Sequence, residues 1–340
     1  MIVSGNEAIT FGAIDAGATY MGGYPITPSS DIMLYWVRER KNNPNLLFLQ
    51  TEDEISAIHS IIGAALGGRK SFTATSGPGF SLMQEGIGLA YAYRVPVVIV
   101  NAQRQGPSTG MPTLFSQDNI LQTQWGTHGD HISIVFSPNS VQECYEMAIH
   151  SFNAACESRS PVILLSDGAI SMLYETFERK HNIPISEFPI EPFGSETRHF
   201  TGLTNVNGVP DTKNAESYKK WISEITMPIV ETSKKYNFYE YKKNSKSNTL
   251  LISFGFLSRV TEEWEKEFSL FRPIRLFPVL EDELLKISKD YENIILVEGN
   301  YRQYKMVLEA TLKREIKEVS VVGGSIKPSD IYQEVKNLLK

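Results

Sequence analysis

The chain has very little cysteine. Its 340 residues include two, Cys144 and Cys156, which stand twelve positions apart in a segment with helical periodicity. Two thiols cannot build a disulfide framework, and a cluster of iron and sulfide held by thiolates needs four of them. We therefore expect any iron–sulfur centre that works with this chain to lie on another polypeptide.

Long apolar runs are also missing from the sequence. The first residues, Met1–Glu7, lack the basic start and the continuous apolar core of a signal peptide. Apolar runs such as Pro96–Val100 and Pro161–Leu165 are far too short to cross a bilayer and have the length of buried strands. These features predict a cytoplasmic protein without a membrane partner.

Positive charge is not concentrated anywhere along the chain. The sequence has 33 Lys and Arg residues against 39 Asp and Glu residues, so its formal net charge is −6. Binding to nucleic acid or to an anionic membrane requires a positive field, so we expect neither. The sequence also contains no G-x-G-x-x-G fingerprint and no P-loop, which leaves nicotinamide or ATP binding by those routes unsupported.

A regular alternation of short apolar runs and longer helical patterns fills the first half of the chain, which we assign as a domain over residues 1–175. Apolar runs of this length predict strands buried on both faces, and their alternation with helices predicts a parallel sheet covered on both sides. The expected strands are Thr19–Gly23, Leu46–Gln50, Ser71–Thr75, Val97–Asn101, Ile132–Phe136 and Val162–Ser166. The expected helices are Glu7–Ala16, Ser29–Arg40, Glu54–Leu66, Ser81–Tyr93 and Val141–Glu157.

Turn-forming residues dominate the next stretch, residues 176–247, which we interpret as a linker or excursion between two domains. It contains the turn-rich segment Gly202–Pro210 and one amphipathic helix expected from Asn214 to about Lys235. The stretch is too long for a passive loop, so we expect it to pack on another part of the molecule.

The alternating pattern returns in residues 248–340 and predicts a second, smaller α/β domain. Its expected strands are Thr249–Gly255, Ile274–Pro278, Asn293–Glu298 and Val319–Val322. Its expected helices are Leu257–Phe268, Asp282–Lys289, Arg302–Lys313 and Ser329–Leu339, the last with Ser329 as its N-cap.

Four polar loops follow strands of the first domain. Three are rich in Gly, Pro, Ser and Thr (Gly22–Ser30, Thr73–Phe80 and Arg104–Thr113), and the fourth, Thr51–Glu54, brings carboxylates to a helix start. Loops at the carboxyl ends of parallel strands line the ligand crevice, so we expect the four to outline one polar site. Taken singly, each is equally compatible with an ordinary turn or with acids that favour a helix N-terminus.

Three of these segments carry a resemblance to a known family. Tyr24–Ser30, Thr75–Met83 and Gly106–Thr113, in this order and spacing, resemble the alpha subunit of 2-oxoacid:ferredoxin oxidoreductases. The resemblance runs through most of the first domain. It implies a thiamine-diphosphate pyrimidine-binding domain with a parallel sheet, followed by a transketolase C-terminal-like α/β domain.

The same resemblance implies a division of labour between chains. A beta subunit is expected to hold the pyrophosphate, Mg²⁺ and an Fe–S cluster, and to pass electrons to ferredoxin; gamma and delta subunits are further candidates as partners. The present sequence agrees with this division, since it has no Gly-Asp-Gly magnesium motif and only two cysteines. We therefore expect no metal ligands on this chain.

Glu54 is the residue that we expect to be catalytic. Thiamine chemistry needs a carboxyl group against N1′ of the aminopyrimidine, and in the family this residue opens the helix after the second strand. Burial among the small and apolar residues that follow would raise its pKa and favour the sharing of a proton. Glu52 is the alternative catalytic residue. A purely structural interpretation is that both acids stand here because the helix dipole stabilises negative charge at a helix N-terminus.

Arg104 is expected to bind the substrate carboxylate, because a guanidinium can hold a carboxylate with two parallel hydrogen bonds. The resemblance also assigns Thr27 to the substrate and cofactor region and Thr113 to recognition of the substrate side chain. A surface position for Arg104 and roles in turns for Thr27 and Thr113 are the alternatives.

The remaining cofactor-facing candidates are Tyr24, Pro25, Ile26, Ser76 and Gly77. His128, Asp130 and His131 are candidates for the mouth of the site, whereas His59, Tyr301 and Tyr304 fit packed or interface side chains.

The implied reaction is the oxidative decarboxylation of a 2-oxoacid with coenzyme A, giving an acyl-CoA, carbon dioxide and reduced ferredoxin. Overall resemblance favours 2-oxoglutarate. Leu114 stands where a basic residue is expected after Thr113, and with Phe115 it favours a branched-chain 2-oxoacid; pyruvate is a further alternative. Two other classes stay open: a non-redox thiamine-dependent transferase or decarboxylase subunit, and a non-catalytic scaffold.

Overall fold

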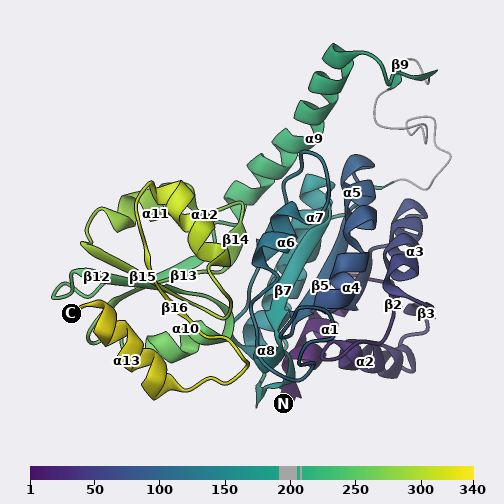
Figure 1. Cartoon of the computed structure of the whole chain (residues 1–340). Helices are drawn as coiled ribbons and strands as arrows, with labels where there is room; N and C mark the ends of the chain where they lie inside the picture. The colour runs from purple at the N-terminus through teal and green to yellow at the C-terminus, as the bar shows by residue number, and fades with distance from the viewer. Residues whose placement is uncertain (191–204, 207–208) are drawn as a thin grey trace.

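The computed structural model describes residues 1–190, 205–206 and 209–340. Within them, the chain forms two α/β halves that lie side by side, each built on one large sheet (Figure 1). The first sheet has seven strands in the order β14-β6-β7-β5-β4-β2-β3, and all are parallel except β14. Their bounds are β2 Tyr20–Gly23, β3 Leu47–Gln50, β4 Ser71–Thr75, β5 Val97–Gln103, β6 Ile134–Phe136, β7 Val162–Asp167 and β14 Arg275–Phe277.

The second sheet has five strands in the order β11-β13-β12-β15-β16. Only the edge strand β11 runs antiparallel to its neighbour. Their bounds are β11 Tyr239–Lys242, β12 Thr249–Ser253, β13 Ser269–Pro273, β15 Asn293–Glu298 and β16 Lys317–Ser320. This half carries the helices α10 Gly255–Glu262, α11 Glu281–Ser288, α12 Gln303–Leu312 and α13 Pro328–Leu338.

Helices cover both faces of the first sheet, as the strand pattern predicts for strands buried on both sides. On one face α1, α2 and α7 bury apolar side chains such as Ile9, Trp36 and Phe152 in one cluster. On the other face α3, α4 and α5 pack in a second cluster, which continues without interruption into the second sheet through Leu250 and Leu296. The bounds are α1 Gly5–Asp15, α2 Ser30–Arg40, α3 Glu54–Leu66, α4 Gly77–Leu82, α5 Gln84–Ala92 and α7 Val141–Ser158.

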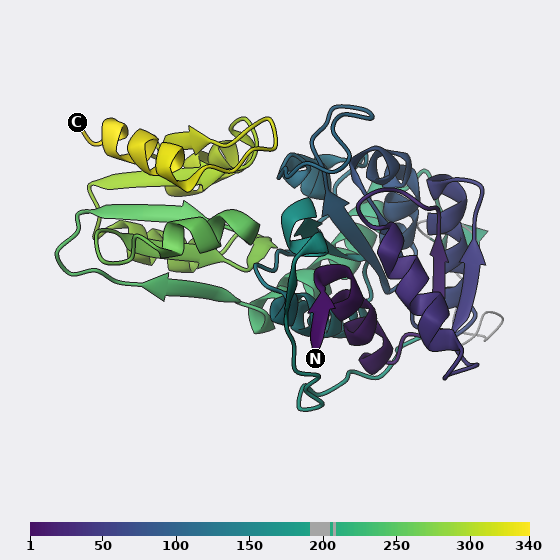
Figure 2. The same cartoon turned by 90° about the horizontal axis from the view of Figure 1, so that it is seen from below.

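The remaining elements connect or flank these layers. The long helix α9, Ala215–Lys235, packs on α7 through Ile225 and Ile229, and its first turns project beyond the first half (Figure 1). Figure 2 shows the second sheet beside the helices of the first half. The short elements are β1 Ile2–Ser4, α6 Ile120–Trp125, α8 Gly168–Met172, β8 Tyr174–Thr176, β9 Asn205–Val206 and β10 Val209–Pro210.

The fold class predicted from the sequence is confirmed, and several elements differ from their prediction. The strand expected at Ile274–Pro278 joins the first sheet rather than the second, antiparallel to β6. The helix expected at Ser81–Tyr93 is two helices, α4 and α5, which meet at Met83. Ser329 lies inside α13, whose N-cap is Lys327. Most of the turn-rich segment Gly202–Pro210 lies outside the described residues.

No helix in the part of the chain that the structure describes is long and apolar enough to cross a membrane.

Candidate active site

A cleft of about 620 Å³ opens between the two halves at the carboxyl ends of the first sheet's strands. One wall consists of Gly77, Pro78, Ser81, Arg104, Gln105, Gly106, Pro107, Ser108, Asp118, Asn119 and Gln122. The other wall belongs to the second half and consists of Asn300, Tyr301, Gln303 and Val322. Two of the four loops expected to form the site therefore line this cleft directly, and the other two adjoin it through single residues.

Glu54 lies at the first position of α3, close to these loops. Asp53 caps the helix by accepting a hydrogen bond from the Ser56 N–H at 2.7 Å, which fixes where the following carboxylate points. The Glu54 side chain is buried, with 5% of its surface exposed. Burial raises the pKa of the Glu54 carboxyl; its own backbone N–H lowers that pKa, the Asp53 charge raises it, and the Arg104 charge lowers it.

The surroundings of Glu54 fit a flat polar ring better than another protein side chain. Within the described residues, no side chain donates a hydrogen bond to its carboxylate. Gly79 faces it so closely that a methyl group at this position would overlap both Glu54 Oε1 and Thr75 Oγ1. The Ser76 hydroxyl, between β4 and α4, and the Asn101 amide oxygen on β5 are buried without hydrogen-bond partners. Orphaned polar atoms of this kind are rare unless a ligand satisfies them.

Arg104 follows β5 and reaches across to the loop after β2. Its Nη1 donates to the Thr27 carbonyl oxygen at 2.8 Å, while its buried Nε has no hydrogen-bond partner. Only 7% of the residue is exposed; burial lowers the pKa of its guanidinium, and the charge of Glu54 opposes that shift. The guanidinium stays charged at any physiological pH, so it offers the cleft a fixed cation with free donors.

The other predicted site residues separate into two groups. Ser76 and Gly77 lie at the start of α4 beside Glu54, and Tyr24, Pro25, Ile26 and Thr27 form the loop that Arg104 holds. Thr113 is exposed and does not line the cleft, because the loop turns back on itself where Met111 N donates to the Gln105 carbonyl at 2.8 Å.

The candidates for the mouth of the site lie elsewhere. His128 is exposed and faces Glu85 at 3.4 Å, and His131 packs edge-on against Tyr91. Neither residue, nor Asp130, lines the cleft. His59, expected to be a packed side chain, is exposed and bonds to the Ile55 carbonyl of its own helix. Tyr304 is a fully buried core residue, as expected. Tyr301 is exposed and lines the cleft, which the expectation of a packed or interface aromatic did not include.

Sequence reasoning missed the residues that complete the cleft. Asp118, Asn119 and Gln122 follow the third polar loop without a Gly or Pro signal of their own. Asn300 and Gln303 belong to the other half of the molecule. Their arrival at the site is a consequence of tertiary packing, although a polar Gly-Asn-Tyr turn directly after a buried strand was a usable signal.

Comparison with known proteins gives three kinds of match. Residues 11–208 match the family described as pyruvate flavodoxin/ferredoxin oxidoreductase, thiamine diP-binding. The chain is 35% identical to the 2-oxoglutarate synthase subunit KorA of Methanothermobacter marburgensis, over 99% of this chain and 98% of that protein. It is 34% identical to the KorA subunit of Archaeoglobus fulgidus, over 99% of both. The ketoisovalerate oxidoreductase subunit VorB of Methanothermobacter marburgensis is 30% identical, over 99% and 97%.

Two solved structures resemble the fold. A 2-oxoglutarate:ferredoxin oxidoreductase from Magnetococcus marinus, solved with 2-oxoglutarate, coenzyme A and succinyl-CoA, superposes with a TM-score of 0.92 at 25% identity, covering 100% of this chain and 65% of that one. A split-gene transketolase superposes with a TM-score of 0.62 at 12% identity, a likeness of fold alone. With full-length relatives of this kind and a thiamine-binding match over more than half its length, the chain belongs to the 2-oxoacid:ferredoxin oxidoreductase family as an alpha-type subunit.

Proposed function

We propose that this chain, together with a beta subunit, catalyses the coenzyme A-dependent oxidative decarboxylation of 2-oxoglutarate to succinyl-CoA and carbon dioxide, with reduction of ferredoxin. The observation that carries the proposal is the pairing of a buried carboxyl, Glu54, with a buried guanidinium, Arg104, at one edge of the first sheet. The Glu54 carboxyl suits proton exchange with the aminopyrimidine of the cofactor, and the Arg104 guanidinium suits binding of the 2-oxoacid carboxylate. The full-length similarity to KorA subunits supports the choice of 2-oxoglutarate.

Glu54 is the residue that we assign to the aminopyrimidine of thiamine diphosphate. When bound, this cofactor supplies the carbanion chemistry and the electron sink of the reaction. Burial raises the pKa of the Glu54 carboxyl and so favours its neutral form, which suits the sharing of a proton with a ring nitrogen. Gly79, Ser76 and Gly77 leave room beside it, and Tyr24, Pro25, Ile26 and Thr27 form the adjoining loop.

Arg104 binds the 2-oxoacid carboxylate in this proposal, with Thr27 placed by its bond to the same guanidinium. Among the described residues that line the cleft, Arg104 is the one with a basic side chain. The second carboxylate of 2-oxoglutarate must therefore find neutral donors such as Gln122 and Gln303, or a cation on the partner chain. Thr113 stays a proposal for side-chain recognition that depends on movement of its loop or on the partner.

We propose that this chain supplies the part of the cofactor site that binds the aminopyrimidine. A beta subunit supplies the pyrophosphate site, Mg²⁺ and the Fe–S cluster in this proposal. Large apolar side chains are exposed on the elements that adjoin Glu54: Leu49 on β3, Ile55 on α3 and Leu82 on α4. Such exposure next to a catalytic carboxyl suits burial by a partner chain. Gamma and delta subunits fit the same assembly, and a cytoplasmic location fits the ferredoxin partner.

The proposed function is tested on the chain co-purified with its beta partner. Thiamine-dependent dye reduction is measured with 2-oxoglutarate, pyruvate and branched-chain 2-oxoacids, with and without coenzyme A. We expect coenzyme A-dependent turnover that is fastest with 2-oxoglutarate. Preference for a branched-chain acid would instead assign Leu114 and Phe115 to the substrate. A complex that binds the cofactor and reduces no dye with any acid would overturn the redox reaction in favour of a non-redox thiamine enzyme.

A further inference from the structure

The segment after the third polar loop, residues 114–119, is built into both halves of the molecule. Phe115 belongs to the apolar cluster of the second half with Leu251 and Val297. Gly299 is required beside it, because a methyl group there would come within 2.6 Å of the Phe115 ring. Leu114 sits in the same way over Gly324, whose φ of +75° also favours glycine. The segment is therefore clamped by close packing against two turns of the second half.

Gln117 is the polar centre of this clamp and is fully buried. Its Nε2 donates to the Phe254 carbonyl at 2.8 Å, and its Oε1 accepts from the Gly299 N–H at 2.9 Å. Its backbone N–H donates to the Gly299 carbonyl at 2.9 Å, and its carbonyl accepts from Asn300 Nδ2 at 2.8 Å. These four hydrogen bonds join Gln117 to the ends of β12 and β15 in the second sheet. The amide also bonds to the Asp167 carboxyl at the end of β7, so Gln117 joins the two sheets and has most of its hydrogen bonds on the second.

The two residues that follow Gln117 hold the substrate loop. Asp118 Oδ2 accepts from the Gly106 N–H at 2.7 Å. The Asn119 N–H donates to Oε1 of Gln103 at 3.1 Å, at the end of the strand that precedes Arg104. Asp118 and Asn119 also line the cleft. A shift of Gln117 would therefore be passed through one or two hydrogen bonds to the backbone on either side of Arg104.

We propose that Gln117 is a positioning residue that makes the placement of Arg104 depend on the docking of the second half. This inference rests on the proposed function, since it takes Arg104 as the group that binds the 2-oxoacid carboxylate. It assigns to the second sheet a role in substrate affinity rather than in the chemical step. Loosening the clamp should let the Arg104 loop sample other positions, which lowers the fraction of molecules ready to bind.

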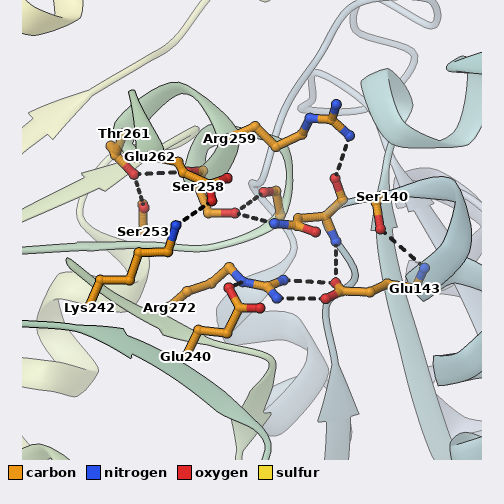
Figure 3. A network of polar contacts seen from close by, with 12 residues as sticks. Ser140, Glu143, Glu240, Lys242, Ser253, Ser258, Arg259, Thr261, Glu262 and Arg272 are labelled. Atoms are coloured by element: carbon orange, nitrogen blue, oxygen red, sulfur yellow. Dashed lines mark hydrogen bonds and ion pairs between the residues drawn. The ribbon is translucent and has the colours of Figure 1, made fainter. Parts of the chain in front are cut away.

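The two halves are also joined away from the cleft, and this second contact supplies the control. Figure 3 shows Arg272 of β13 between Glu143 and Glu240, with Arg259 nearby. Arg259 donates to the Asn139 carbonyl at 3.2 Å and pairs with Glu175 at 2.7 Å. Arg259→Gln therefore weakens the same junction without touching the Gln117 segment. Gln117→Met keeps the side-chain length and removes the amide bonds to Phe254, Gly299 and Asp167. Gln117→Glu keeps an acceptor for Gly299 and loses the donor that faces Phe254 and Asp167.

The first measurement is hydrogen–deuterium exchange of the full chain in complex with its beta partner, without substrate. Loss of one or two buried hydrogen bonds should speed exchange in residues 105–113 by about tenfold in Gln117→Met. We expect a change of at least similar size in Gln117→Glu, which buries a carboxyl against the Phe254 carbonyl and Asp167, and none there in Arg259→Gln. Unchanged exchange in residues 105–113 of Gln117→Met would overturn the proposal, whether or not the complex turns over any acid.

The second measurement is the steady-state rate with the preferred 2-oxoacid. We expect Gln117→Met to raise KM by about tenfold while kcat stays within about threefold, as for lost substrate positioning. Faster exchange with unchanged KM would refute the role in substrate binding. If the wild-type complex turns over no 2-oxoacid, the proposed function fails, and the exchange result alone decides whether Gln117 holds the loop. If Gln117→Met does not fold, Gln117→Glu carries both measurements.

Discussion

The Glu54 carboxyl occupies a place where a charge is disfavoured and a shared proton is favoured. It is buried at the start of a helix, beside Asp53, whose charge raises the pKa of Glu54 further. The helix N-terminus and Arg104 act in the opposite direction. A buried carboxyl whose pKa is raised is suited to exchanging a proton with a ring nitrogen.

Replacing Glu54 by Gln should abolish this proton exchange while leaving the fold intact. We expect the rate of proton exchange at C2 of bound thiamine diphosphate, followed by NMR, to fall by about a hundredfold or more, as for loss of a general acid–base group. Glu52→Gln is the matched control, because Glu52 is exposed and two positions away. Normal exchange in Glu54→Gln with slow exchange in Glu52→Gln would transfer the role to Glu52.

The Arg104 guanidinium should be irreplaceable even by lysine. Lysine keeps the charge and loses the planar set of donors that now reaches Thr27 and leaves Nε free. We expect Arg104→Lys to raise KM for the 2-oxoacid about tenfold or more, because hydrogen bonds to a charged group are strong. Arg69→Lys, at an exposed position, should leave KM unchanged. Equal KM values in both variants would refute carboxylate binding by Arg104.

At the residue scale, the sequence predicts the parts of the site that belong to one strand and its loop. Glu54 and Arg104 are of this kind, because each stands directly after a strand within a recognisable motif. Gln117 and Asn300 are not, since each depends on a partner about 180 positions away in the sequence. A single buried glutamine between two polar residues has no local pattern that distinguishes it from an exposed one.

At the scale of elements, the close approach of α4 to α3 shapes the surroundings of Glu54, where we propose that the cofactor binds. Gly79 in α4 is the contact point, because a Cβ atom there would lie 2.3 Å from both Glu54 Oε1 and Thr75 Oγ1. A side chain here would push the carboxylate away from the position that helix α3 gives it. The backbone conformation of Gly79 is one that any residue can adopt, so it does not explain the glycine. The short distance between α3 and α4 is what requires a residue without a side chain.

Gly79→Ala should therefore weaken cofactor binding more than it weakens the fold. We expect the affinity of the complex for thiamine diphosphate, measured by titration of intrinsic fluorescence, to fall about tenfold, because cores that are overpacked force their neighbours to shift. Gly63→Ala in α3 is the matched control: a methyl group there meets nothing within 4 Å, and helix propensity should stabilise the protein by up to about 1 kcal/mol. An unchanged affinity in Gly79→Ala would mean that Glu54 has room to move.

The strand β13 is an element that pattern analysis misses. β13, Ser269–Pro273, is fully buried, yet it contains Arg272 and ends in proline, so it does not resemble a buried strand in sequence. The structure resolves the conflict through Glu143, which binds Arg272 with two hydrogen bonds, and through Glu240. Strands and helices without such long-range compensation, for example β4 and α3, have the bounds that their sequences predict.

At the scale of the whole molecule, the junction between the halves is polar as well as apolar. Asp167, at the end of β7, is buried and accepts hydrogen bonds from the Ile170 N–H at the start of α8 and from the Phe256 N–H at the start of α10. One carboxylate thus faces the first turns of two helices, one from each half. The sequence does not predict the contact between Asp167 and α10, because the two are far apart in the chain and only tertiary packing brings them together.

The stability of the junction should depend on pH through this carboxyl. Burial raises the pKa of Asp167 from 3.8 to about 6, against the effect of its backbone donors. Between these values the folded protein binds more protons than the unfolded chain, so the contribution of Asp167 to stability is full below about pH 4 and is lost as the pH rises through 6. The loss amounts to roughly 3 kcal/mol.

Asp167→Asn removes this titrating group. The slope of unfolding free energy against pH, compared between wild type and the variant, therefore tests the contribution of Asp167. We measure the free energy of unfolding in urea for both proteins and subtract the value of the variant from that of wild type at each pH. We expect this difference to fall between about pH 4 and pH 6 and to stay constant above, where the carboxylate is fully ionised. The variant can accept only one of the two backbone hydrogen bonds and turns donors toward the other, so its absolute stability is lower at every pH. Asp31→Asn, at an exposed helix start, should keep the wild-type slope. Parallel curves for wild type and Asp167→Asn would show that Asp167 stays ionised throughout. The hydrogen bonds that it accepts from the Ile170, Phe256 and Ala169 backbone and the Gln117 side chain, rather than burial, would then set its pKa.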